Sequence, residues 1–275
     1  MKSRLYSMDN LLFEELFFHQ DYVQVWQELN QKADDESINV KYVEVSRLLG
    51  QYAALNNQFI SIFNTKSQRV LYMSENYLDV MGYGCTEEEY KRWSTFYWMR
   101  DLPFAQSWFF MQMTLFFKNT VQAKLKAAQS KKSLTWYMHN FLLTPPESSL
   151  HHISLSGSGL ELTADGSMVV MLLIIKDVGP IIKDNSPWWA EFCINGEEKY
   201  YFHQSEKKFQ KGSILTDRER EILLLIKEGA ETKQIAERLF ISPHTVDKHR
   251  KNMLERTGSK DTSCLIQICE KGKII

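Results

Sequence analysis

The residues most informative about chemistry lie in the C-terminal quarter of the chain, where polar side chains recur at the spacing of helix starts. Thr216 and Glu219 are placed so that a hydroxyl and a carboxylate can bond the free backbone amides at the start of a helix. Ser242 can cap a helix that begins with Pro243. Proline fits the first helical position because the amide it lacks would have no partner there. Thr232 can cap a further helix between these two. The pattern predicts successive short helices of the helix-turn-helix type.

The helix that follows Ser242 has two different sides. Helical spacing places Val246, Met253 and Thr257 on the inner side, away from a set of polar side chains. That set consists of His244, Asp247, Lys248 and Lys251. A helix whose exposed N-terminal face carries such groups can reach base edges in a DNA major groove. From 243 to 260, five lysines and arginines stand against two acidic residues, a local net charge of +3 in a chain of formal charge −1. The sequence thus indicates local attraction for phosphate.

We predict DNA contact from nine side chains in this region. They are Thr232, Lys233, Ser242, His244, Thr245, Asp247, Lys248, Arg250 and Lys251. The alternative is that this polar face is only solvated. Asp247 also has two interpretations, because its carboxylate can accept a hydrogen bond from a cytosine or adenine amino group, or can simply pair with Lys251 one turn later.

Three stretches, 215–223 (LTDREREIL), 235–239 (IAERL) and 241–249 (ISPHTVDKH), resemble the LuxR/FixJ helix-turn-helix family. The similarity covers about 60 residues, 213 to 272. It implies a four-helix DNA-binding domain whose last helix, here 262–271, commonly dimerises. Asp247 stands where the family often has lysine or arginine, which weakens phosphate attraction. Thr257 and Ser259 replace usual aliphatic residues, and we expect a looser link into the last helix.

The predicted last helix carries an apolar set that little of the remaining domain could cover. The set is Cys264, Leu265, Ile266, Ile268 and Cys269. Such a surface favours self-association, so we expect a homodimer that reads two half-sites on double-stranded DNA. Contacts elsewhere, including the first 55 residues, are the alternative source of the dimer. RNA polymerase is a further candidate partner for a regulator of this kind.

The preceding chain has strand and hairpin signals. Apolar runs predict strands at 59–63, 70–73, 134–143, 153–163, 168–176, 189–194 and 199–202, with a helix over 104–129. Ala164-Asp165-Gly166 and Asn195-Gly196 are turn signals, and Asn-Gly favours a type I′ turn. The polar segment 203–212 is interpreted as a linker. Tyr137, His139 and Phe141 alternate along one strand, either lining a ligand cavity or packing within the sheet.

The order of a strand pair, short helices, a long helix and three strands over 55–180 resembles a PAS domain. The predicted fold class is α+β: a PAS-like antiparallel sheet with helices, followed by an all-α four-helix helix-turn-helix domain. We place a helical N-terminal segment at 1–55 and the PAS-like sensor domain at 56–182. A β-hairpin and linker follow at 183–212, and the DNA-binding domain occupies 213–275. No cofactor is evident, although the PAS-like domain could hold a small-molecule ligand.

Composition limits the remaining choices. The chain has 275 residues, 44% of them hydrophobic and 24% charged, which is typical of soluble globular proteins of about two domains. The four cysteines, Cys85 among them, form no CxxC pair, and adjacent His151 and His152 point to opposite faces of a strand, so we predict no metal site. No apolar run approaches the ~20 residues that span a bilayer, and the N-terminus lacks a signal-peptide core, so we expect a cytoplasmic location without membrane contact.

Catalytic motifs are missing from the sequence: it has no phosphate-binding glycine loop, GxSxG, HExxH or kinase signature. We therefore expect no catalytic residues and no enzymatic activity. The predicted function is a bacterial, sequence-specific DNA-binding transcription regulator, in which a one-component sensor domain modulates the helix-turn-helix. The alternatives are a sigma-factor-like initiation subunit and a regulator that acts mainly through protein–protein contacts.

Overall fold

The computed structural model describes residues 49–51, 53–65, 69–81, 104–128, 132–143, 151–183 and 185–275. Most of the predicted N-terminal helical segment lies outside these residues, as does Cys85; residues 49–51 and 53–55 are helical. Contacts between residues divide the chain into two units. The first comprises 1–133, 142–151 and 157–176, and the second comprises 134–141, 152–156 and 177–275. Each unit is described separately below.

The first unit contains the predicted strand pair. β1 (Gln58–Asn64) and β2 (Arg69–Met73) are antiparallel, and β1 also pairs antiparallel with β5 (Met168–Asp177). In β1, Phe59 and Ile62 are at most 3% exposed, as expected for a strand with neighbours on both edges and cover on both faces.

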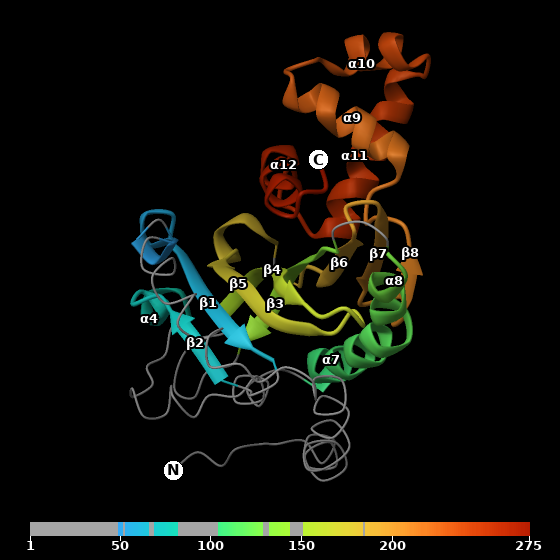
Figure 1. The fold of residues 1–275 in the computed structure, drawn as a ribbon. Helices are drawn as coiled ribbons and strands as arrows, with labels where there is room; N and C mark the ends of the chain where they lie inside the picture. Colours follow the sequence, from blue (N-terminus) through green and yellow to red (C-terminus); the bar gives the residue numbers. More distant parts are fainter. Residues whose placement is uncertain are drawn as a thin grey trace. The chain divides into compact units, whose positions relative to one another are not determined.

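The predicted long helix is confirmed, with one irregular turn. The short helix α4 (Tyr77–Met81) precedes it. The long helix consists of α7 (Phe104–Phe116), the π-helical turn η1 (Phe117–Val121) and α8 (Gln122–Ala127), which follow one another as a green rod in Figure 1. The helix is tied to the strands at two points: the Leu142 amide donates to Gln106 Oε1 (3.0 Å), and Gln122 Nε2 donates to Ser167 Oγ (2.9 Å).

Three further strands confirm the sequence prediction. They are β3 (Leu134–Leu143), β4 (His151–Leu162) and β5. The turn between β4 and β5 contains Gly166 with φ +85°, and a Cβ there would lie 2.5 Å from the Gln122 carbonyl oxygen. Only glycine satisfies both the backbone angle and this close approach.

Hydrogen-bonded strand neighbours follow the order β2-β1-β5-β4-β3-β6-β7-β8. The first five have the order of a PAS domain, and every pair whose register is described is antiparallel. The fold class is therefore the predicted one: an antiparallel sheet with helices, followed by an all-helical C-terminal part.

The second unit contains a three-stranded meander where one hairpin and a linker were expected. Its strands are β6 (Trp189–Ile194), β7 (Glu198–His203) and β8 (Phe209–Lys211). Asn195 and Gly196 both have positive φ, +56° and +77°, so the Asn-Gly turn is confirmed. The interpretation of 203–212 as a linker is wrong for residues 209–211, because they form β8 and pair with β7. The domain boundaries proposed from the sequence stay a prediction.

Four helices complete the second unit. They are α9 (Asp217–Lys227), α10 (Thr232–Leu239), α11 (Pro243–Thr257) and α12 (Thr262–Lys271). The capping box of Thr216 and Glu219 is confirmed, and so is the cap by Ser242. Thr232 is not the cap of α10, because Glu231 takes that position and its amide donates to the Gln234 side chain. Thr232 is instead the first helical residue.

The apolar side of α12 is covered by the chain itself. Leu265, Ile268 and Cys269 are fully buried in a core that also contains Tyr137 and Trp189 of the sheet. The expectation of an open self-association surface is therefore wrong for these three residues, while Cys264 and Ile266 are partly exposed. The four-helix domain is too short to cover this side of α12 by itself, and the strand side chains Tyr137 and Trp189 cover it.

The link into α12 is also better fixed than predicted. Thr257 and Ser259 are fully buried, and their hydroxyl oxygens lie 2.8 Å apart. Thr257 Oγ1 also donates to the Met253 carbonyl (2.8 Å). Because these buried hydroxyls have partners, they replace aliphatic packing without loosening the connection.

Candidate nucleic-acid interface

The N-terminal end of α11 is firmly capped. Ser242 Oγ accepts a hydrogen bond from the Thr245 amide (3.1 Å), and Pro243 occupies the first turn. The preceding turn passes through Phe240, which has φ +55° and is 95% exposed. This geometry reverses the chain between α10 and α11 and leaves the start of α11 open to solvent.

The two sides of α11 are arranged as the sequence predicts. Val246, Met253 and Thr257 are fully buried. The polar set, His244, Asp247, Lys248 and Lys251, is exposed. The structure thus brings the predicted base-reading residues together on one solvent-facing side of a capped helix. Lys233, in the first turn of α10, is exposed as well.

Asp247 does not pair with Lys251. Lys251 Nζ lies 3.7 Å from Glu255 Oε1 instead, and both of these side chains are largely exposed. Among the described residues, Asp247 has no ion pair. The interpretation of Asp247 as only a partner of Lys251 is therefore not supported.

Arg250 differs from the exposed lysines of the predicted set because its guanidinium bonds to two other helices of the unit. Its guanidinium lies 3.3 Å from the hydroxyl oxygens of Thr232 and Thr262, and it is half-buried. Arg250 thereby joins the start of α10, the middle of α11 and the start of α12. Thr232, which is also predicted to contact DNA, is therefore a hydrogen-bond partner of Arg250.

The positive charge counted from the sequence is not all on the exposed polar side of α11. Arg256 is bound to Glu219, and Lys260 Nζ donates to the Pro180 carbonyl (2.9 Å). Together with Arg250, three of the five basic residues between 243 and 260 are therefore bonded inside the unit. The local field at the exposed side of α11 comes mainly from Lys248 and Lys251.

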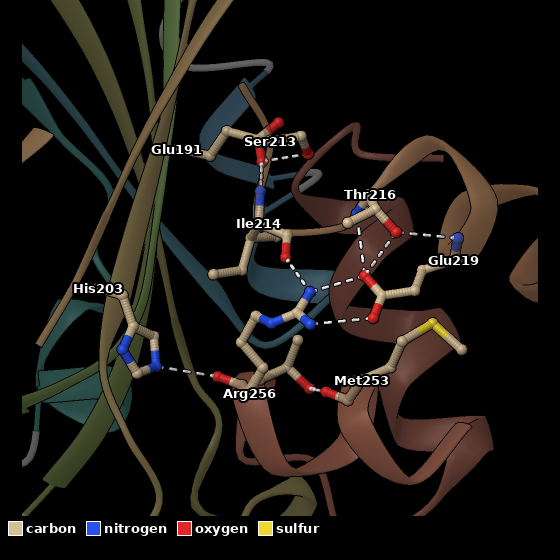
Figure 2. Close-up of polar contacts among 9 residues, drawn as sticks. Glu191, His203, Ser213, Ile214, Thr216, Glu219, Met253 and Arg256 are labelled. Carbon is tan, nitrogen blue, oxygen red and sulfur yellow. Dashed lines mark hydrogen bonds and ion pairs between the residues drawn. The ribbon is translucent and has the colours of Figure 1, made fainter. Parts of the chain in front are cut away.

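Arg256 is the centre of the polar network that holds α11 on its scaffold (Figure 2). Its two terminal nitrogens donate to both carboxylate oxygens of Glu219, at 2.6 and 2.9 Å, and one of them also donates to the Ile214 carbonyl. Burial alone would raise the pKa of Glu219, but the bonds from Arg256 and from Thr216 lower it overall. The buried carboxylate is therefore charged and fully paired.

Sequence reasoning missed a second set of contacts, which come from the sheet. Glu191 Oε2 accepts from the Ser213 hydroxyl (2.6 Å) and from the Ile214 amide (2.9 Å). His203 Nε2 lies 3.1 Å from the Arg256 carbonyl oxygen (Figure 2). The sequence offered one signal for these contacts: Glu191 and His203 lie on strands that are otherwise rich in aromatic residues. A polar side chain buried in such a strand needs a hydrogen-bond partner.

The alternating row Tyr137, His139, Phe141 does not share one face. Tyr137 and His139 stack, with ring centroids 6.0 Å apart, and both pack against Trp189. Phe141 packs on Trp188 instead. Asn140 between them has φ +58°, which breaks the alternation of the strand. These residues form sheet packing.

No cluster of three potential metal-binding side chains occurs among the described residues. His152 Nδ1 lies 2.6 Å from Asn140 Oδ1, so the ring is held within the sheet. The described helices include none that is long and apolar enough to cross a membrane.

A capped helix-turn-helix with an exposed polar recognition helix defines a DNA-binding protein. Residues 213–269 match the family model "Bacterial regulatory proteins, luxR family". The spore germination protein GerE of Bacillus subtilis is 39% identical over 70 residues, which are 25% of this chain and 95% of GerE. The chain therefore belongs to the luxR family of bacterial regulatory proteins, and it is a DNA-binding transcription regulator.

Other relatives share less of their length. The oxygen regulatory protein NreC of Staphylococcus aureus is 40% identical over 62 residues, and the match spans 22% of this chain and 29% of NreC. Two solved structures of VqmA, one bound to DPO and one of the Vibrio cholerae dimer without target DNA, have TM-scores of 0.27 and 0.29 at 13% and 14% identity. Each similarity covers 82% of this chain and 86% of the VqmA chain.

Proposed function

We propose that this chain is a one-component regulator, in which α11 reads DNA sequence in the major groove and the PAS-like part modulates that binding. The observation that carries the proposal is the two-sided α11, with a buried apolar side and an exposed polar side that begins at a capped N-terminus. A helix held in this way presents its first turns to base edges.

The nine predicted side chains receive different roles in this proposal. His244 and Asp247 read base edges, while Lys233, Lys248 and Lys251 bind phosphates. The hydroxyl groups of Ser242 and Thr245 lie 2.9 Å apart at the end of α11 that would enter the groove, where they can bond a phosphate. Arg250 and Thr232 contact the DNA backbone. Through their hydrogen bonds they also connect α10, α11 and α12.

The PAS-like part is assigned the sensing role. Its supports are the strand order and the aromatic content of the chain, 13%, which suits a domain that encloses a small molecule. A ligand that binds two states of this domain unequally would shift the DNA affinity by at most that free-energy difference. The protein acts without catalysis, in the cytoplasm.

We further propose that the protein binds DNA as a homodimer. Leu265, Ile268 and Cys269 are buried within one chain, so the dimer contacts involve other residues. A two-fold dimer would place two copies of α11 about one helical turn apart on DNA.

Selection from a random duplex pool tests the proposal. The full-length protein should enrich a motif with two half-sites separated by about 10 base pairs. Sedimentation with the selected duplex should then show two chains for each DNA. A pool that stays unenriched would contradict sequence-specific binding, and one chain for each duplex would contradict the dimer.

A further inference from the structure

The C-terminal end of the recognition helix α11 is bonded by two side chains of the sheet and by Ser186, which precedes β6. The last carbonyls of a helix have no partner within the helix. Here three consecutive carbonyls are satisfied from outside: Arg256 by His203 Nε2 (3.1 Å), Thr257 by Trp189 Nε1 (3.3 Å) and Gly258 by Ser186 Oγ (2.7 Å). We call these three donor side chains the carbonyl clamp.

The clamp continues through the backbone of the segment before β6. The Lys183 amide donates to the Gly258 carbonyl (3.3 Å), and Ile182 forms a bridge with Ser259. Gly258 has φ +74°, and a Cβ there would lie 2.6 Å from the Ser186 Cβ. Glycine thus allows the helix end and this segment to approach closely.

Two clamp residues lie side by side in the sheet. Trp189 of β6 is opposite His203 of β7 and, on its other edge, opposite His139 of β3. Trp189 and His139 have no exposed surface. This row runs across three adjacent strands, so a change in sheet geometry would move both donors together.

His203 is held in one hydrogen-bonding arrangement. Its Nδ1 atom accepts from the Ser205 amide (3.3 Å), which leaves Nε2 with the proton that it donates to Arg256. The same Arg256 binds Glu219 with its side chain. The final turn of α11 is therefore fixed on two sides, by its scaffold helix and by the sheet (Figure 2).

The clamp leaves the DNA-facing side of α11 free, because His244, Asp247, Lys248 and Lys251 are exposed while the helix end is held. At 1.5 Å for each residue, the 15 residues of α11 span about 22 Å, so a tilt of ~10° about the clamp would move the base-reading end by about 4 Å. Such a displacement exceeds the tolerance of a base-edge hydrogen bond.

We propose that Trp189 and His203 are positioning residues for DNA recognition, which set the angle of α11 through its terminal carbonyls. This inference rests on the proposed function and names the route by which the sheet acts on sequence readout. Neither residue contacts DNA in this proposal. Their effect should therefore appear in discrimination between DNA sequences, more than in general attraction to DNA.

The test uses full-length variants and two probes: the duplex selected by the wild-type protein, and a scrambled duplex of the same composition. Trp189→Phe keeps an aromatic ring but lacks the indole N–H. Trp188→Phe is the matched control, because it makes the same change one residue earlier, where the ring stacks on Phe202. His203→Leu removes the second donor, and His203→Gln restores an N–H at similar reach.

We expect Trp189→Phe and His203→Leu to lower the ratio of specific to non-specific affinity by about tenfold, equivalent to losing one base-pair contact. Trp188→Phe and His203→Gln should keep the ratio within about twofold of wild type, and affinity for the scrambled duplex should not change. Circular dichroism identifies the temperatures at which each variant is folded, and binding is compared below its melting transition. Should one donor variant fail to fold, the other carries the test.

The inference would be overturned if folded Trp189→Phe and His203→Leu keep the wild-type ratio of specific to non-specific affinity. An increased ratio would also overturn it, because the clamp would then hinder specific binding. A loss that His203→Gln does not rescue would also overturn it for His203. These results differ from failure of the proposed function, in which the wild-type protein itself selects no DNA sequence.

Discussion

Arg256 and Glu219 join the last turn of the recognition helix to the first turn of α9 through two parallel hydrogen bonds, 2.6 and 2.9 Å long. The carboxylate is 3% exposed and also completes the capping box of Thr216. One glutamate therefore both starts the scaffold helix and fixes the end of α11, the helix that we propose reads DNA.

Replacing Arg256 by alanine should destabilise the protein strongly. The buried Glu219 carboxylate would lose its counter-charge, and breaking such a pair costs about 3 kcal/mol of unfolding free energy. Urea unfolding followed by circular dichroism measures the loss. Arg238→Ala is the control, because Arg238 and Glu228 are exposed and 3.9 Å apart, and its effect should stay below about 1 kcal/mol. Equal effects of the two variants would contradict the central role of Arg256.

The buried His139 should make stability depend on acid pH. Burial, with a contribution from Lys271, lowers its pKa from 6.5 to about 3. The unfolded chain then binds a proton that the folded chain does not, so stability is full above pH 6.5 and falls as the pH drops towards 3. From pH 7 to pH 5 this residue should remove about 2 kcal/mol, at 1.4 kcal/mol for each unit.

Phenylalanine at position 139 removes this titration while keeping a ring of similar size. The unfolding free energy of His139→Phe should therefore decline less than that of the wild type between pH 7 and pH 5, in parallel urea titrations. Curves that remain parallel over this range would show that burial of His139 does not cause the acid sensitivity.

Asp247 should contribute base discrimination and weaken general DNA attraction. In Asp247→Ala, the loss of a negative charge near phosphate should tighten non-specific binding, while preference at one base pair relaxes by about 1–3 kcal/mol. Competition binding against single-base variants of the selected duplex measures both effects. Glu237→Ala removes an exposed acid from α10 and should leave the ranking of duplexes unchanged. An unchanged ranking for Asp247→Ala as well would exclude base readout by this residue.

The affinity for DNA should depend steeply on salt, and Lys248 should account for part of that dependence. A lysine that neutralises one phosphate releases about one counterion, so Lys248→Ala should reduce the slope of log affinity against log salt by about 1. Lys207→Ala, at an exposed site in the turn after β7, should leave the slope unaltered. Fluorescence anisotropy at several salt concentrations provides the slopes, and identical slopes for all three proteins would contradict phosphate contact by Lys248.

Local features were predicted well from the sequence because their causes are local. Thr216 with Glu219, Ser242 with Pro243, and the Asn-Gly turn each place interacting groups within a few residues, so spacing alone identifies them. The helix-turn-helix and its exposed polar side follow from the same short-range signals.

Features that depend on distant partners could not be predicted. Arg256 and Lys260 were counted as attraction for DNA, but one binds Glu219, 37 residues away in sequence, and the other binds the Pro180 carbonyl, 80 residues away. The left-handed Asn140 interrupts a strand whose residue types indicate regular alternation. The cover of α12 by Tyr137 likewise needs a contact between segments more than 100 residues apart, for which hydrophobic periodicity carries no information.

The clamp has a practical consequence for limited proteolysis. Lys207 and Lys208 lie exposed in the turn before β8, where trypsin can cleave. A cut there leaves the bonds from Trp189 to Thr257 and from Glu191 to Ser213 intact, and β8 still pairs with β7. The two fragments should migrate as one species in a native gel and separate only in detergent. We therefore expect the four helices α9 to α12 to stay on the sheet without peptide connectivity at this turn.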